Sequence, residues 1–94
     1  CLITADCVYR HRAYNNYVKD ISMGGVFMET RESFSEGEEI LLTLSMAHYL
    51  KPFKIAGEIV WSTPRGIGVK FKIMSQVQQE LIQNLVKQVE KFKK

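Results

Sequence analysis

The sequence has few of the residues that catalysis requires. Among 94 residues there are only two histidines, His11 and His48, and both fall in stretches predicted to be turns or loops. An enzyme needs a nucleophile with a base, a metal site or a matched acid–base pair. The chain contains no G-x-S-x-G, no H-E-x-x-H and no G-x-x-x-x-G-K phosphate loop. We therefore predict that the protein is not an enzyme.

Cysteine and long apolar runs are equally scarce. If residues 1–9 form a strand, the two cysteines, Cys1 and Cys7, lie about 20 Å apart at ~3.3 Å per residue, too far for a disulfide. Neither has a second Cys or a His at metal-ligand spacing, so we predict no metal site. No apolar run reaches the ~18–20 residues that a membrane span needs, and no signal-peptide pattern is present. These absences favour a cytoplasmic protein with reduced cysteines and no membrane partner.

Charge of one sign is also limited. The 13 basic and 10 acidic residues give a formal net charge of +3, a mild excess. Nucleic-acid-binding proteins usually carry a dense basic face with interleaved aromatic residues. The stretch 10–17 holds two arginines, a histidine and two tyrosines, which is short enough to be a solvated hairpin. We predict no nucleic-acid partner.

What the sequence does contain is alternation of apolar and polar residues, which is typical of strands with one buried face. Six strands are expected, at residues 1–9, 17–22, 26–30, 39–46, 53–62 and 67–73. Residues 10–16, with their charges and an Asn-Asn pair, are expected to form a turn, and residues 47–52 are expected to form a loop. Gly57 inside the fifth strand is expected to mark a bulge or a close backbone approach.

The last segment changes its period. Residues 75–92 carry apolar side chains at steps of three and four, which predicts an amphipathic helix, and Ser75 with Gln78 fits a capping box at its start. The apolar positions are Val77, Leu81, Ile82, Leu85, Val86, Val89 and Phe92. Short strands at regular spacing followed by one helix predict a single domain, residues 1–94, that is a small antiparallel barrel or sandwich.

The stretch DISMGG, residues 20–25, has two interpretations. Asp20 can accept two hydrogen bonds from the N1–H and N2–H₂ groups of guanine, and Ser22, on the same side of an extended chain, can donate another. Gly24 and Gly25 would let a planar base come close to the backbone. Alternatively, Asp and Ser cap a turn that the two glycines make.

The wider pattern resembles a known family. DISMGGVFMET, FSEGEEILLTLSM, IAGEIVWS and GIGVKF, followed by a helix, resemble the PilZ domain in order and spacing across essentially the whole chain. The resemblance implies an all-β fold with a C-terminal helix, a six-stranded antiparallel β-barrel of the split-barrel type. It also implies a bacterial receptor for cyclic di-GMP, with the D-x-S-x-x-G element at Asp20, Ser22 and Gly25 contacting a guanine.

The family's second motif, R-x-x-x-R, grips phosphates just before the first strand, and no two arginines here are four apart. Because the chain begins with Cys1 rather than Met, we expect natural residues upstream that hold this pair; otherwise the domain does not bind the nucleotide. Arg10 and Arg12 are not assigned to the site. Trp61 either stacks on a guanine or packs against the barrel.

The resemblance therefore leaves two functions open. The first is a signalling module that regulates motility or biofilm formation: it binds cyclic di-GMP through Asp20, Ser22, Gly24, Gly25 and Trp61, without a cofactor. It would pass the signal to a partner protein or an attached domain. The second is a degenerate PilZ domain that acts as a protein-interaction module through its helix or a strand edge. The oligomeric state is left open.

Overall fold

Alternation of buried and exposed side chains builds the fold. The computed structural model describes residues 3–46 and 50–91. In the first strand, β1 (Ile3–Tyr9), every second side chain is buried, as in any strand with one face on a core. The other strands are β2 (Arg12–Ile21), β3 (Gly25–Glu29), β4 (Glu39–Met46), β5 (Leu50–Thr63) and β6 (Gly66–Lys72), and one helix, α1 (Gln76–Lys91), follows them.

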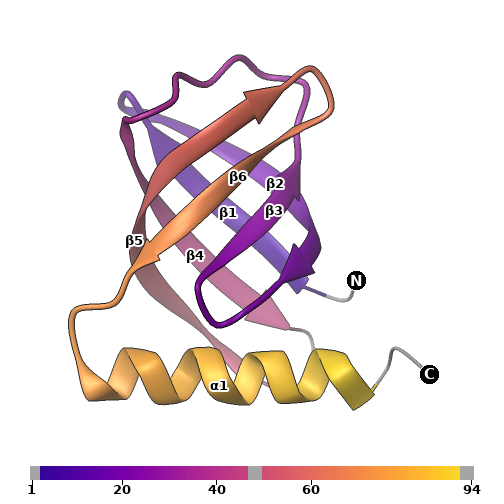
Figure 1. Ribbon diagram of the computed structural model, residues 1–94, viewed down its shortest axis with the longest axis vertical. Helices are drawn as coiled ribbons and strands as arrows, with labels where there is room; N and C mark the ends of the chain where they lie inside the picture. Colours follow the sequence, from indigo (N-terminus) through magenta and orange to yellow (C-terminus); the bar gives the residue numbers. More distant parts are fainter. Residues whose placement is uncertain (1–2, 47–49, 92–94) are drawn as a thin grey trace.

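The six strands form a closed barrel in the order β1-β2-β3-β6-β5-β4 (Figure 1). Every neighbouring pair is antiparallel, and the pairing of β1 with β4 completes the ring. Each of the six described strands thus has a hydrogen-bonded neighbour on both sides, which removes the exposed edges of an open sheet. The predicted six-stranded antiparallel barrel with a C-terminal helix is confirmed.

The helix lies across one end of the barrel (Figure 1). Its side chains Ile82, Leu85 and Val89 are buried and join the same hydrophobic core as the inward-facing residues of the strands. Truncating a fully buried Leu85 to alanine would cost about 2–5 kcal/mol. Val77, predicted on the apolar face, is instead 64% exposed, because it lies off the row of the three buried residues. Phe92 lies outside the described residues.

The helix begins as predicted. The backbone N–H of Gln78 donates to Ser75 Oγ at 3.2 Å, and the Gln78 side-chain oxygen accepts the N–H of Met74 at 2.7 Å. The reciprocal bond of a capping box thus reaches one residue further back than usual.

The predicted turn at residues 10–16 is wrong, because β2 already begins at Arg12. Only Arg10 and His11 form the turn, with φ of 50° and 68°; two residues with positive φ match the twist of a hairpin. Asn16, which suggested a turn, is buried in the barrel. Its amide nitrogen donates to Cys7 Sγ at 3.1 Å and more weakly to the carbonyl of Ala5 at 3.4 Å.

The predicted loop at residues 47–52 is also partly wrong. Residues 47–49 lie outside the described residues, and β5 begins at Leu50. Pro52 fits in this strand because the β4–β5 register shifts between Leu44 and Met46, and irregular pairing tolerates a residue without an N–H. Gly57 marks a close approach, since a Cβ there would lie 2.4 Å from Val69 Cγ1. The bulge is further along β5.

Candidate functional site

Two β-bulges decide which side chains face outward on one side of the barrel. In β2 the register with β3 shifts between Val18 and Asp20, and in β5 the register with β6 shifts between Ile59 and Trp61. Val18 and Ile59 point into the core, with 2% and 0% exposure. With strict alternation Asp20 and Trp61 would also point inward. One extra residue in each strand turns both outward.

These outward residues form a row across four strands. Asp20 of β2 pairs with Phe27 of β3, Phe27 with Gly68 of β6, and Gly68 with Trp61 of β5. The row brings a carboxylate, two aromatic rings and a glycine side by side on the outer surface. Residues more than 40 positions apart in the sequence thus share one face.

Glycines in β6 make room for the two rings. A Cβ at Gly68 would lie 2.2 Å from Trp61 Nε1, and a Cβ at Gly66 would lie 2.8 Å from the Phe27 ring. The indole therefore lies over Gly68, and the phenyl ring lies close to Gly66. The two rings stack, with centroids 4.9 Å apart and planes inclined by 25°. Trp61 packs on the outside of the barrel, not in its core, and is 41% exposed.

A hollow of about 490 Å³ lies around this row, within the ~300–1,000 Å³ typical of small-ligand sites. It is lined by Asp20, Ile21, Ser22, Gly24, Gly25, Val26, Phe27, Val60, Trp61, Gly68, Val69 and Lys70. The structure thus brings together all five residues singled out from the sequence: Asp20, Ser22, Gly24, Gly25 and Trp61.

The β2–β3 turn that carries four of these residues is held by its own hydrogen bonds. The N–H of Ser22 donates to the Gly25 carbonyl at 2.9 Å, and Asp20 Oδ1 accepts the N–H of Ile21 at 3.0 Å. The Ser22 hydroxyl lies 3.4 Å from the same Gly25 carbonyl, which is long for an O–H···O bond. The turn is therefore well formed, and the Ser22 hydroxyl can donate elsewhere at small cost.

The two glycines of the turn differ in their surroundings. A Cβ at Gly25 would lie 2.3 Å from the carbonyl oxygen of Val69, so the β3–β6 pairing itself requires glycine there. A Cβ at Gly24 would meet nothing within 4 Å. The fold explains Gly25, but it gives no packing reason for Gly24.

Among the lining residues that were missed from the sequence, Phe27 and Lys70 have side chains that can contact a ligand. Phe27 supplies the second ring, and Lys70, an exposed lining residue, supplies the cation of the hollow. The alternating glycines of G-I-G-V-K, at Gly66 and Gly68, were the available signal. Outward-facing glycines leave a bare strip on a strand, and neighbouring aromatic side chains can fill it.

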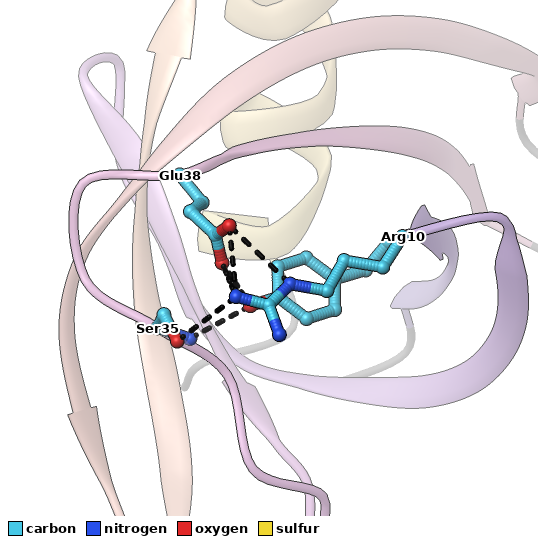
Figure 2. Close-up of polar contacts among 4 residues, drawn as sticks. Arg10, Ser35 and Glu38 are labelled. Atoms are coloured by element: carbon cyan, nitrogen blue, oxygen red, sulfur yellow. Dashed lines mark hydrogen bonds and ion pairs between the residues drawn. The ribbon is translucent and has the colours of Figure 1, made fainter.

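Arg10, in the β1–β2 turn, contacts Ser35 and Glu38 (Figure 2), and Tyr9 joins this cluster through its hydroxyl group. Arg10 Nη2 lies 2.9 Å from both carboxylate oxygens of Glu38, and the Tyr9 hydroxyl donates to the same carboxylate while accepting the N–H of Ser35 at 3.0 Å. The Tyr9 hydrogen bond and then Arg10 lower the pKa of Glu38. Arg10 thus ties the β1–β2 turn to the β3–β4 connection, remote from the hollow.

Within residues 3–46 and 50–91 no cluster of three or more His, Cys, Asp or Glu side chains is placed to hold a metal ion. In the same part of the chain, no helix has the length and apolar character to cross a membrane.

Comparisons with known proteins agree with this architecture. A search among curated proteins found no match. The crystal structure of the PilZ domain of CeSA from a cellulose-synthesizing bacterium superposes with a TM-score of 0.76 at 14% identity, covering 94% of this chain and 92% of that one. An uncharacterized Legionella protein superposes with a TM-score of 0.63 at 11% identity, covering 93% and 86%.

Sequence identities of 14% and 11% show that these structures share the fold alone. Membership of a family is shown by the match to a family model. The PilZ domain family model matches residues 1–88, which include the barrel, both bulges and most of the helix. This chain therefore belongs to the PilZ domain family.

Proposed function

We propose that this protein is a cytoplasmic receptor domain for cyclic di-GMP and regulates a partner by binding it, without catalysis. The observation that carries the proposal is the gathering of Asp20, Ser22, Gly24, Gly25 and Trp61 around one outer hollow. PilZ domains are regulatory binding domains, and many bind this nucleotide, with the D-x-S-x-x-G element contacting a guanine.

The chemistry of the hollow suits one guanine nucleotide. The Asp20 carboxylate accepts two hydrogen bonds from the guanine edge, and the Ser22 hydroxyl donates to a ligand oxygen. The base lies against the exposed Trp61–Phe27 pair, since every base has a π-face that stacks on aromatic rings. The Lys70 ammonium, a strongly hydrated point charge, attracts the phosphate. Gly24 leaves the approach to the backbone open.

The arginine pair of the family completes this picture. An R-x-x-x-R segment upstream of Cys1 would close over the bound nucleotide, with guanidinium groups that bind phosphate in a bidentate way and stack on bases. The ordering of such an arm would change the surface that a partner protein or attached domain contacts, and so pass on the signal.

Calorimetric titration with cyclic di-GMP tests the proposal. The wild-type chain, the same chain with about fifteen natural upstream residues, and the variants Asp20→Ala and Asp6→Ala would be compared. Asp6 is an exposed, outward-facing carboxylate of β1 that does not line the hollow, so it is the matched control. Asp20→Ala should weaken binding at least about 10-fold, since hydrogen bonds to a charged group contribute ~1.5–3 kcal/mol each.

Asp6→Ala should leave the affinity unchanged. Equal affinity of Asp20→Ala and wild type would refute the role of Asp20. If neither the wild-type chain nor its extended form binds cyclic di-GMP while the barrel is folded, the receptor function is refuted.

The second candidate is a protein-interaction module that needs no nucleotide. The observation that favours it is a pair of exposed apolar side chains, three residues apart, where β6 leads into α1: Met74 is 79% exposed and Val77 64%. Contact surfaces of proteins are often marked by large exposed apolar side chains. Replacing both by serine should abolish partner binding under this function, and should leave cyclic di-GMP binding intact under the first.

A further inference from the structure

A second hollow, of about 830 Å³, lies on the same face of the barrel beyond Phe27. It is lined by Tyr17, Lys19, Phe27, Glu29, Thr30, Arg31, Thr63, Pro64 and Arg65. Phe27 lines both hollows, and the β2 bulge sends the neighbouring residues Lys19 and Asp20 to different ones. We refer to the second hollow as the arginine groove.

The groove carries an excess of positive charge. Lys19 is paired with Glu29, the only acidic residue lining the groove, at 3.1 Å between Nζ and Oε1. Among residues 3–46 and 50–91, neither Arg31 nor Arg65 has a carboxylate within ion-pair distance. Within the described part of the chain, the single carboxylate of the groove is thus paired with Lys19, and the two guanidinium groups carry its excess positive charge.

The backbone holds the two arginines close together. The N–H of Thr30 donates to the carbonyl of Arg65 at 3.3 Å, which joins the end of β3 to the β5–β6 turn. That turn is fixed by Thr63, whose Oγ1 accepts the N–H groups of Arg65 and Gly66 at 3.2 Å each. Like charges held near each other raise the electrostatic energy, and an anion between them lowers it. A guanidinium is a rigid fork of donors that fits phosphate oxygens in pairs.

We propose that the arginine groove is a phosphate-binding site in which Arg31 and Arg65 bind the phosphate ester of a nucleotide. The choice of a nucleotide rests on the function proposed above. A base on the Phe27–Trp61 pair is close enough to share its phosphate with the groove, because Phe27 and Thr30 are three residues apart, roughly 10 Å along a strand. The two arginines, which belong to the barrel domain itself, then make the phosphate contacts that the R-x-x-x-R motif makes in the family.

The groove can be tested without any guanine, by titrating the folded chain with inorganic pyrophosphate at low salt. The side-chain N–H resonances of the arginines are followed by NMR. Arg31 and Arg65 should shift together, whereas Arg12, an exposed arginine of β2 that lines neither hollow, should not. The double variant Arg31→Gln/Arg65→Gln should bind pyrophosphate at least about 10-fold more weakly, and Arg12→Gln should bind as wild type does.

Titration of the double variant with cyclic di-GMP then shows whether the groove binds the phosphate of the nucleotide at Asp20 or that of a second nucleotide. If the groove receives the phosphate of the nucleotide read by Asp20, Arg31→Gln/Arg65→Gln should weaken cyclic di-GMP binding about 10-fold or more at unchanged stoichiometry. If the groove takes the phosphate of a second nucleotide, the same variant should lower the stoichiometry and leave the site at Asp20 intact.

The two proposals can fail separately. Pyrophosphate shifts confined to Arg31 and Arg65, with no binding of cyclic di-GMP, would keep the phosphate site and remove the proposed function. Equal shifts at all three arginines would overturn the arginine groove as a phosphate site. Full cyclic di-GMP affinity and stoichiometry in the double variant would overturn it as the site for the phosphate of a nucleotide and leave the receptor function standing.

Discussion

The indole of Trp61 can lie over β6 only because residue 68 is a glycine, and this gives a testable prediction. Gly68→Ala places a Cβ 2.2 Å from Trp61 Nε1, 2.4 Å from Cε2 and 2.8 Å from Cδ1. Ordinary contacts need 3.4 Å or more, so the indole must withdraw by about 1 Å or more, which breaks its stacking with Phe27. Such a stacked pair contributes about 0.5–1.5 kcal/mol beyond the area it buries.

The magnitude follows from two opposed effects. Alanine is preferred to glycine inside a strand by about 0.5–1 kcal/mol, and the lost stack and newly exposed ring surface outweigh this gain when Trp61 is present. Gly68→Ala should therefore cost about 1 kcal/mol of unfolding free energy in the wild type. In a Trp61→Ala background the obstruction is gone, and the same change should be neutral or stabilising by up to about 1 kcal/mol.

Urea unfolding followed by far-ultraviolet circular dichroism, on the four proteins of this cycle, measures the coupling between the two sites. A coupling of about 1 kcal/mol or more is expected for residues in direct contact. Fluorescence of Trp61, the single tryptophan of the chain, should also shift in Gly68→Ala. An equal cost of Gly68→Ala in both backgrounds, with unchanged emission, would refute the proposed contact between indole and strand.

Three further predictions concern the turns. Gly25→Ala should destabilise the barrel by about 1–3 kcal/mol because it overpacks against backbone, whereas Gly24→Ala should change stability by less than about 0.5 kcal/mol yet weaken cyclic di-GMP binding; equal unfolding midpoints for the two would contradict this. His11→Gly should stabilise the protein by about 0.5–1 kcal/mol by removing a left-handed non-glycine residue, seen as a higher melting temperature. Folding lowers the pKa of Glu38, so the contribution of its carboxylate to the free energy of unfolding is complete above the unfolded pKa and is lost as pH falls through the lower folded value. The difference in stability between wild type and Glu38→Gln should therefore disappear only at acidic pH. A difference that does not depend on pH would refute the role of this carboxylate.

The strands were predictable where alternation is regular. β4 was expected at residues 39–46 and lies there, because Ile40, Leu42 and Leu44 face the core without interruption. β2 was expected five residues too late. The sequence gives no glycine at the β1–β2 turn, and Arg10 and His11 adopt positive φ without one. Polar Asn16 then read as part of a turn, although the barrel interior supplies its hydrogen-bond partners.

The candidate site was predictable only in part. A local motif indicated Asp20, Ser22 and the glycines, because their spacing is visible within six residues. The juxtaposition of Phe27 with Trp61 depends on the pairing register of β3, β6 and β5, and a bulge interrupts that register. The arginine groove depends on it even more, since the segments that carry Arg31 and Arg65 are brought together by the pairing of Glu29 with Gly66 and by the hydrogen bond from the Thr30 N–H to the Arg65 carbonyl. Periodicity along one strand carries no information on such contacts.

The two bulges also bear on how relatives of this chain should be compared. Deleting Lys19 would leave every letter of D-x-S-x-x-G in place, yet it would restore regular alternation and turn Asp20 toward the core; deleting Val60 would do the same to Trp61. Formation of the outer hollow therefore depends on the number of residues in β2 and β5 as much as on which residues they are. Among PilZ domains that share D-x-S-x-x-G, a gap of one residue in an alignment of β2 or β5 would separate chains that expose the motif from chains that bury it.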